Sequence, residues 1–128
     1  MPFDIFDAMR KRLSSFRYAF QGIADVFRAQ PNARIHGTVA LLVIAAGLYV
    51  RLSSMEWVAV VLCIAVVIAL EALNTALEHL TNLVSPTHHP LAGKAKDAAA
   101  AAVLIAVFGA VIVGLLIFLP KMSAFNTL

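Results

Sequence analysis

Three long apolar stretches constrain the fold of this chain more than any other feature. They cover residues 35–50, 57–70 and 98–119, and the middle stretch continues in a helical pattern to about residue 84. A helix of ~20 apolar residues spans a ~30 Å hydrocarbon core, so each stretch is close to the required length, although the first is short. With 62% hydrophobic and 13% charged residues, the 128-residue chain also has too little polar surface for a water-soluble globule. The sequence therefore predicts an all-α membrane protein with three transmembrane helices.

The residues before the first stretch predict a helix on the membrane surface. Apolar side chains recur there at spacings of three and four against a basic face, and they are Ile5, Met9, Leu13, Phe16, Phe20, Ile23 and Phe27. An amphipathic helix of this kind, over residues 4–29, lies in the lipid interface rather than across the bilayer. Pro31 and Asn32 are expected to break it. Because the stretch is amphipathic rather than a short basic segment followed by apolar residues, we expect it to be retained and not cleaved as a signal peptide.

We expect a single domain over residues 1–128. Its predicted parts are a surface helix over residues 1–32 and membrane helices over residues 35–52, 56–84 and 97–119. The one cysteine, Cys63, falls inside the second span, so no disulfide framework is expected.

The distribution of basic residues predicts the orientation in the membrane. Six of them precede the first span, namely Arg10, Lys11, Arg12, Arg17, Arg28 and Arg34. The first connection holds only Arg51, whereas Lys94 and Lys96 lie between the second and third spans. The positive-inside rule then places the N-terminus and the second connection in the cytoplasm, with Lys121 as a minor contrary signal.

Two carboxylates and an amide lie on one face of the second span. Glu71, Asn74 and Glu78 are three and seven residues apart, which puts the two carboxylates ~10 Å apart along a helix. If Trp57 marks the outer interface, Glu71 lies ~21 Å further in, near the inner edge of the hydrocarbon, and Glu78 lies at the headgroup level. Ionisable residues at membrane depth are functional candidates by default.

This geometry suits a reaction that joins a lipid headgroup to a water-soluble reagent. A carboxylate at the boundary could accept a proton from a lipid hydroxyl, and one at the headgroup level could hold a divalent metal. Two other interpretations stay open on the spacing alone. The carboxylates could pair with Arg or Lys to lock a helical bundle, or Glu71 could be a proton relay in a small transporter subunit.

The connection over residues 85–97 is polar and leads directly into the third span, where it could place Lys96 and Asp97 beside these carboxylates. It contains no Walker loop, because His88 stands five residues before Gly93 where that loop has a glycine. Bound phosphates would therefore need separate cations and a bridging metal. His88 and His89 are not expected to hold zinc, because no cysteine or third histidine lies at ligand spacing.

At this point the sequence resembles the prokaryotic diacylglycerol kinases and their undecaprenol kinase relatives. The resemblance rests on Glu71-Ala-Leu-Asn-Thr-Ala-Leu-Glu78 and on the segment from His89-Pro-Leu-Ala-Gly-Lys-Ala-Lys-Asp97 to Leu104. Two further segments match, Ser15-Phe-Arg-Tyr-Ala-Phe-Gln-Gly-Ile23 and Asn32-Ala-Arg-Ile-His36, of which the latter is more similar to the undecaprenol kinase branch. Together the matches cover nearly the whole chain in the family's order.

The resemblance implies a small, multi-pass kinase of the bacterial cytoplasmic (inner) membrane that phosphorylates a lipid alcohol. By that likeness Glu71 is the catalytic base, Asn74 supports it, and Glu78 binds the Mg²⁺ that carries ATP. Contacts to the nucleotide are implied for Tyr18, Glu78, His89, Lys96 and Asp97. The resemblance further implies a homotrimer with its active sites near subunit boundaries, and no nucleic-acid partner is expected.

Two positions depart from the family's pattern. The family usually has a glutamate at Gln30, where it resembles a second metal carboxylate, and often an aspartate at Asn82. Glutamine offers a carbonyl oxygen but no charge, so metal binding is expected to be weaker at this site. The hypothesis of an active lipid kinase is therefore carried beside that of a catalytically weakened, lipid-binding or assembly member.

Overall fold

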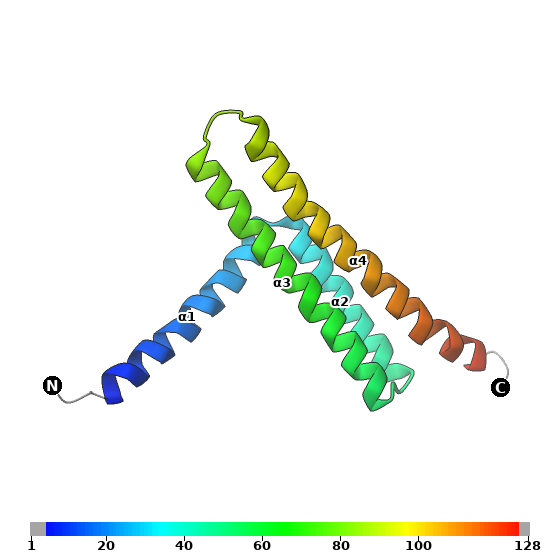
Figure 1. Ribbon diagram of the computed structural model, residues 1–128. Helices are drawn as coiled ribbons and strands as arrows, with labels where there is room; N and C mark the ends of the chain where they lie inside the picture. Colours follow the sequence, from blue (N-terminus) through cyan, green and yellow to red (C-terminus); the bar gives the residue numbers. More distant parts are fainter. Residues whose placement is uncertain (1–4, 126–128) are drawn as a thin grey trace.

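The computed structural model describes residues 5–125 as four α-helices (Figure 1). They are α1 (Ile5–Ala29), α2 (Pro31–Tyr49), α3 (Ser54–Val84) and α4 (Pro90–Phe125). The last three helices pack side by side, with the most extensive contact between α3 and α4, while α1 leaves the bundle at an angle (Figure 1). Three helices, α2, α3 and α4, are long and apolar enough to cross a membrane. The predicted fold class, an all-α membrane protein with an additional N-terminal helix, is confirmed.

A tight turn joins α2 to α3. Leu52 N donates to Gly47 O at 3.0 Å and Arg51 N donates to Leu48 O at 3.4 Å, the pattern of a Schellman motif. Arg51 takes the left-handed conformation that this motif requires, with a φ of 56°. As a result α2 ends at Tyr49 rather than at the predicted residue 52. Ser53 and Glu56 then form a capping box that starts α3.

Gly47 allows this turn to pack against the helix before it. A Cβ atom at Gly47 would lie 2.8 Å from Leu52 Cδ1 and 2.9 Å from a ring carbon of Trp57. The absence of a side chain therefore permits the close approach of α2 and α3 at this end.

The fourth helix begins earlier and ends later than predicted, at Pro90 rather than residue 97 and at Phe125 rather than residue 119. Proline suits the first turn of a helix because its missing N–H would have no intrahelical partner there. The early start is also supported by His89, whose Nδ1 accepts a hydrogen bond from Leu91 N at 3.2 Å. The connection between α3 and α4 is thus much shorter than the sequence suggested.

A single residue, Gln30, separates α1 from α2. Pro31 does not merely end the first helix, because it also forms the first residue of the next one. The junction is packed, since Val26 and Ala33 are buried and a Cβ at Gly37 would lie 2.7 Å from the Phe27 ring. These contacts fix where α1 leaves the bundle.

Few side chains are buried in this arrangement. The buried apolar residues are Val26, Ala33, Leu52, Val60, Val67, Ala99 and Val103, and the buried polar residues are Glu71 and Thr75. The predicted apolar face of α1 is largely open, with Phe16 67% and Phe20 69% exposed. Such large apolar surfaces require lipid or further helices to cover them.

Candidate active site

Glu71 is the buried charged residue of the bundle and lies in the C-terminal half of α3. It is 2% exposed, and the neighbouring Thr75 is 3% exposed. The Thr75 hydroxyl donates to the backbone oxygen of Glu71 at 2.8 Å, so it is satisfied by its own helix. The Glu71 carboxylate instead faces α2, where His36 Nε2 lies 3.1 Å from Glu71 Oε1.

His36 was not among the predicted site residues. One signal was available, because an ionisable side chain near the start of a membrane span is itself a functional candidate. Its partner was not predictable from spacing, since His36 and Glu71 belong to different helices that only the packing of α2 on α3 brings together.

Glu78 and Gln30 form another polar pair, two turns further along α3. Gln30 Nε2 donates a hydrogen bond to Glu78 Oε2 at 2.6 Å, across a separation of 48 residues in the chain. This hydrogen bond is partly buried. The structure therefore brings together the two residues that were predicted to bind metal.

Lys96 and Asn82 form a third pair, between α4 and the end of α3. Lys96 Nζ donates to Asn82 Oδ1 at 2.6 Å. Because the asparagine is neutral, this contact orients the lysine without cancelling its charge. Lys96 remains a positive group close to the end of α3 that carries Glu78.

The other predicted site residues are placed in different ways. Asn74 is half-buried on α3 between the two carboxylates, and Asp97 lies on α4 beside Lys96. His89 is exposed, with one ring nitrogen occupied in starting α4. Tyr18 is 68% exposed on α1, and twelve residues of helix put it ~18 Å before Gln30. Within one chain, Tyr18 therefore lies apart from the other predicted site residues.

The partners of the two carboxylates bear on the interpretation that they only lock the bundle. Such a lock was expected to use Arg or Lys, whereas the observed partners are His36 for Glu71 and Gln30 for Glu78. A full ion pair between α3 and α4 does occur, but at the opposite end, where Lys121 Nζ lies 3.1 Å from Glu56 Oε2.

Within residues 5–125 no group of three or more His, Cys, Asp and Glu side chains could hold a metal by itself. One carboxylate, Glu78, and the carbonyl of Gln30 are the oxygen groups available at the predicted site. This set fits Mg²⁺, which proteins often bind through one or two carboxylates with the remaining positions filled by water and substrate phosphates.

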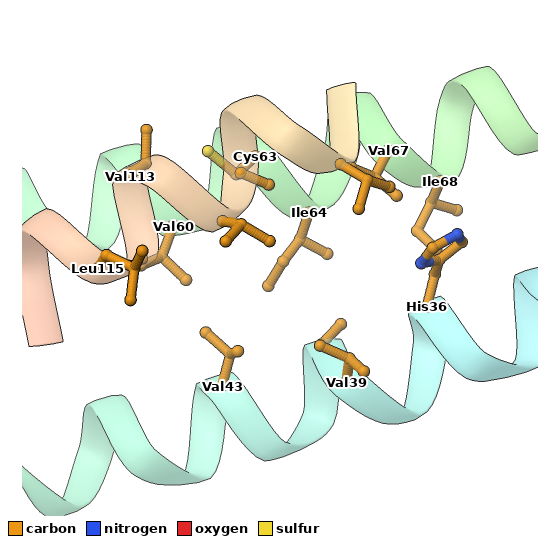
Figure 2. A pocket seen from close by; sticks show the side chains of 15 residues that line it. His36, Val39, Val43, Val60, Cys63, Ile64, Val67, Ile68, Val113 and Leu115 are labelled. Carbon is orange, nitrogen blue, oxygen red and sulfur yellow. The ribbon is translucent and has the colours of Figure 1, made fainter. Parts of the chain in front are cut away.

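An apolar groove of about 280 Å³ runs beside the site between α2, α3 and α4. Figure 2 shows Val39 and Val43 of α2 facing Ile64 and Val60 of α3 across this space, with His36 at one end. The groove therefore connects the hydrocarbon-like interior of the bundle to the residue that contacts Glu71.

Comparison with known proteins matches the family described as prokaryotic diacylglycerol kinase over residues 17–118. The chain is 43% identical to the undecaprenol kinase of Bacillus subtilis (strain 168), over 89% of this chain and 93% of that protein. It is also 43% identical to a diacylglycerol kinase of Synechocystis sp., over 86% of this chain and 63% of that protein. The identity to the diacylglycerol kinase of Escherichia coli (strain K12) is 30%, over 74% of this chain and 78% of that protein.

The family match covers the C-terminal part of α1, all of α2 and α3, and α4 as far as residue 118. It therefore includes the pairs of His36 with Glu71, Gln30 with Glu78 and Lys96 with Asn82. The predicted lipid kinase function is confirmed at the level of the family, and the transporter hypothesis has no support from these relatives. The chain belongs to the prokaryotic diacylglycerol kinase family of lipid kinases.

Proposed function

We propose that the protein transfers the γ-phosphate of ATP to the hydroxyl of a membrane lipid alcohol at the cytoplasmic interface, with Glu71 as the general base. The observation that carries this proposal is the buried Glu71 carboxylate, 2% exposed, two helical turns from the pair of Glu78 with Gln30. A buried acceptor beside an apolar groove suits a substrate whose hydroxyl arrives from the lipid side.

Phosphate transfer to the lipid hydroxyl requires one group that accepts the hydroxyl proton, and this role is assigned to Glu71. The lipid hydroxyl gives its proton to Glu71 while its oxygen bonds to the γ-phosphorus, and the bond from that phosphorus to the bridging oxygen of ADP breaks. ADP leaves with the electron pair, and the proton is later lost from Glu71 to water. The side chains align the reactants and stabilise charge, and no covalent enzyme intermediate is required.

In this proposal Glu78 would hold Mg²⁺, with the carbonyl oxygen of Gln30 as a neutral additional ligand. The bound ion supplies neutralisation of phosphate charge. For Gln30 to present its carbonyl to a cation, the amide must turn from the orientation in which its Nε2 donates to Glu78. Lys96 is assigned to the phosphates because its charge is not cancelled by Asn82.

The remaining nucleotide contacts are proposed from the family resemblance. Asn74 lies between the carboxylates on α3 and is assigned to the same polar cluster, and Asp97 and His89 lie at the same end of α4 as Lys96. For Tyr18 we propose that it reaches the nucleotide of a neighbouring subunit, since it lies on α1, which leads away from the bundle (Figure 1).

We propose undecaprenol as the preferred lipid. The undecaprenol kinase of B. subtilis corresponds to this chain over 93% of its length, whereas the equally similar Synechocystis diacylglycerol kinase does so over 63%. The apolar groove that ends at His36 is assigned to the first part of the lipid's hydrocarbon chain, next to its hydroxyl (Figure 2).

The direct test is phosphate transfer by the purified protein in mixed micelles with Mg-ATP, with undecaprenol and diacylglycerol offered in parallel. We expect labelled phosphate on both lipids, with a higher kcat/KM for undecaprenol. A higher kcat/KM for diacylglycerol would reverse the lipid assignment. Transfer to neither lipid would overturn the proposed function.

The cytoplasmic location of the site is tested by single cysteines in a Cys63→Ala background. Thr87 lies in the α3–α4 connection and Ser54 at the start of α3, and both are exposed. An impermeant thiol reagent added to intact cells should label Ser54→Cys and leave Thr87→Cys unlabelled. Labelling of Thr87→Cys from outside would put the site on the wrong side of the membrane for ATP.

A homotrimer is proposed from the family resemblance and the small number of buried residues in a single chain. Partner subunits would cover part of the open apolar surface of α3 and α4. The mass of the detergent-solubilised protein, measured by light scattering with the detergent contribution subtracted, should be three times that of the chain.

A further inference from the structure

The Glu71 carboxylate needs a polar partner because burying it is costly. An ionised carboxylate removed from water loses several kcal/mol of solvation, and only close polar partners compensate for it. The Glu71 side chain is 3% exposed, and the polar side chain that the described residues place against its carboxylate is His36, at 3.1 Å. The contact with His36 therefore stabilises the ionised form of Glu71, which is the form that can accept a proton.

We propose that His36 is the positioning residue of the catalytic base. A carboxylate oxygen can only accept a hydrogen bond, so the contact requires that the proton of the imidazole be on Nε2. His36 then holds Oε1 of Glu71 and leaves the other oxygen, Oε2, to take the proton of the lipid hydroxyl. This inference rests on the proposed function and adds a residue of α2 to the contacts of the proposed base on α3.

The position of His36 in the fold supports this role. Its backbone is fixed on both sides, since Ala33 is 0% exposed and Gly37 lies against the Phe27 ring of α1. The side chain is 22% exposed and also lines the apolar groove. His36 therefore contacts the carboxylate that would receive the proton, and it also lies at one end of the groove proposed as the path of the lipid (Figure 2).

The neighbouring polar groups do not duplicate the contact from His36. The pair of Gln30 with Glu78 contributes a hydrogen bond to Glu78 and none to Glu71. The Thr75 hydroxyl is used by the backbone. His36 is thus the group whose removal should alter the orientation of the Glu71 carboxylate without touching the groups assigned to the nucleotide.

The test compares two amides that differ in reach. The side-chain N–H₂ of His36→Gln extends about as far as the histidine Nε2, whereas that of His36→Asn stops one bond short. We expect His36→Asn to lower kcat for lipid phosphorylation by ~10- to 100-fold, the range associated with a misplaced catalytic group. His36→Gln should recover most of that loss, and neither variant should change KM for Mg-ATP.

Thr38→Val is the matched control on the same helix. Its hydroxyl donates to the Arg34 backbone oxygen at 2.9 Å, and we expect kcat to stay at the wild-type level. In a Glu71→Gln background, His36→Asn should cause little further loss, because a positioning residue has no effect once its target is gone.

Three outcomes would overturn this inference: equal kcat for His36→Asn and wild type, equal loss in His36→Asn and His36→Gln, or a loss that appears in KM for Mg-ATP. Size-exclusion profiles establish that the variants remain assembled. The failure of the proposed function is a different result, because wild type itself would then transfer no phosphate to either lipid.

Discussion

The two ends of the helical bundle solve the same problem, the placement of charged groups beside a membrane, in opposite ways. At the turn end, defined by Ser53, Glu56 and Lys121, the polar groups are paired with one another. Ser53 and Glu56 form a capping box at the start of α3, and Glu56 forms an ion pair with Lys121 of α4. At the site end, defined by Gln30, His36, Glu71, Glu78, Asn82 and Lys96, each charged group contacts a partner that is uncharged or only conditionally charged.

This contrast indicates where the chemistry can occur. The Glu56 carboxylate is engaged by Ser53 N at 2.7 Å and by Lys121 Nζ at 3.1 Å, which leaves it little capacity for a substrate. At the site end, the neutral side chains of Gln30 and Asn82 orient Glu78 and Lys96 without cancelling their charges. The paired charges at the turn end therefore stabilise the fold. The incompletely neutralised charges at the site end are able to bind phosphate or a metal and to accept a hydroxyl proton.

The largest expected effect comes from the same substitution made at two positions of α3. Glu71→Gln should lower lipid phosphorylation ~10²- to 10⁴-fold, the usual contribution of a general base. Glu56→Gln, on the same helix, should leave turnover unchanged. Both proteins should remain inserted and assembled, as judged by membrane fractionation and gel filtration. Turnover by Glu71→Gln above about a tenth of wild type would contradict the assigned role.

Magnesium dependence should be the next largest difference. Gln30→Glu places another carboxylate beside Glu78, where Gln30 now donates at 2.6 Å, so two negative charges would favour a cation between them. It should lower the Mg²⁺ concentration needed for half-maximal lipid phosphorylation. Glu78→Gln should nearly abolish activity and be only partly rescued by excess Mg²⁺.

Asn32→Asp is the control for this magnesium titration. Asn32 is exposed and lies two residues after Gln30. The substitution therefore adds the same negative charge close to the site but outside the pair with Glu78. An unshifted curve for Gln30→Glu, or an equal shift for Asn32→Asp, would remove Gln30 from the metal site.

A smaller effect is expected at the nucleotide contact. Asn82→Asp would turn the 2.6 Å hydrogen bond from Lys96 into an ion pair and so compete with phosphate for the lysine. Exposed ion pairs contribute ~0.2–1 kcal/mol, which corresponds to a KM for Mg-ATP raised up to about fivefold. Asn82→Ala, which frees the lysine, should not raise KM. If Asn82→Asp leaves KM unchanged, Lys96 does not bind the phosphates.

The smallest effect is expected at the turn end. The Glu56 and Lys121 side chains lie near the surface, so a double-mutant cycle of Glu56→Gln with Lys121→Met should give only a small coupling in unfolding free energy. Chemical denaturation in detergent measures this coupling, with kcat followed in the same samples. A loss of kcat in either variant would show that the turn end is not independent of the site.

Much of the site end was predictable because its residues lie close together in sequence. Glu71, Asn74 and Glu78 share one helix face, and a helix fixes that relation without any tertiary contact. Gln30 was added through the family resemblance, and the structure places it against Glu78. His36 was missed because the packing of α2 on α3, rather than any periodicity, sets its distance from Glu71.

The helix boundaries illustrate the same limit. Three apolar stretches and one amphipathic pattern predicted four helices. However, α2 ends early because Arg51 adopts a left-handed conformation, and α4 starts early because Pro90 is favoured in a first turn. Both ends depend on local hydrogen bonds that hydropathy does not report.

The sequence alone was enough to predict three apolar helices of membrane-spanning length, an amphipathic N-terminal helix and the face of α3 that carries the carboxylates. Hydrocarbon thickness and helical periodicity act on each of these segments separately. The packing of the helices determines which groups meet between them: His36 with Glu71, Gln30 with Glu78, and Lys96 with Asn82. These pairs depend on how closely the helices approach one another. That distance is set by contacts such as the one between the Phe27 ring and Gly37, and no pattern along a single helix predicts it.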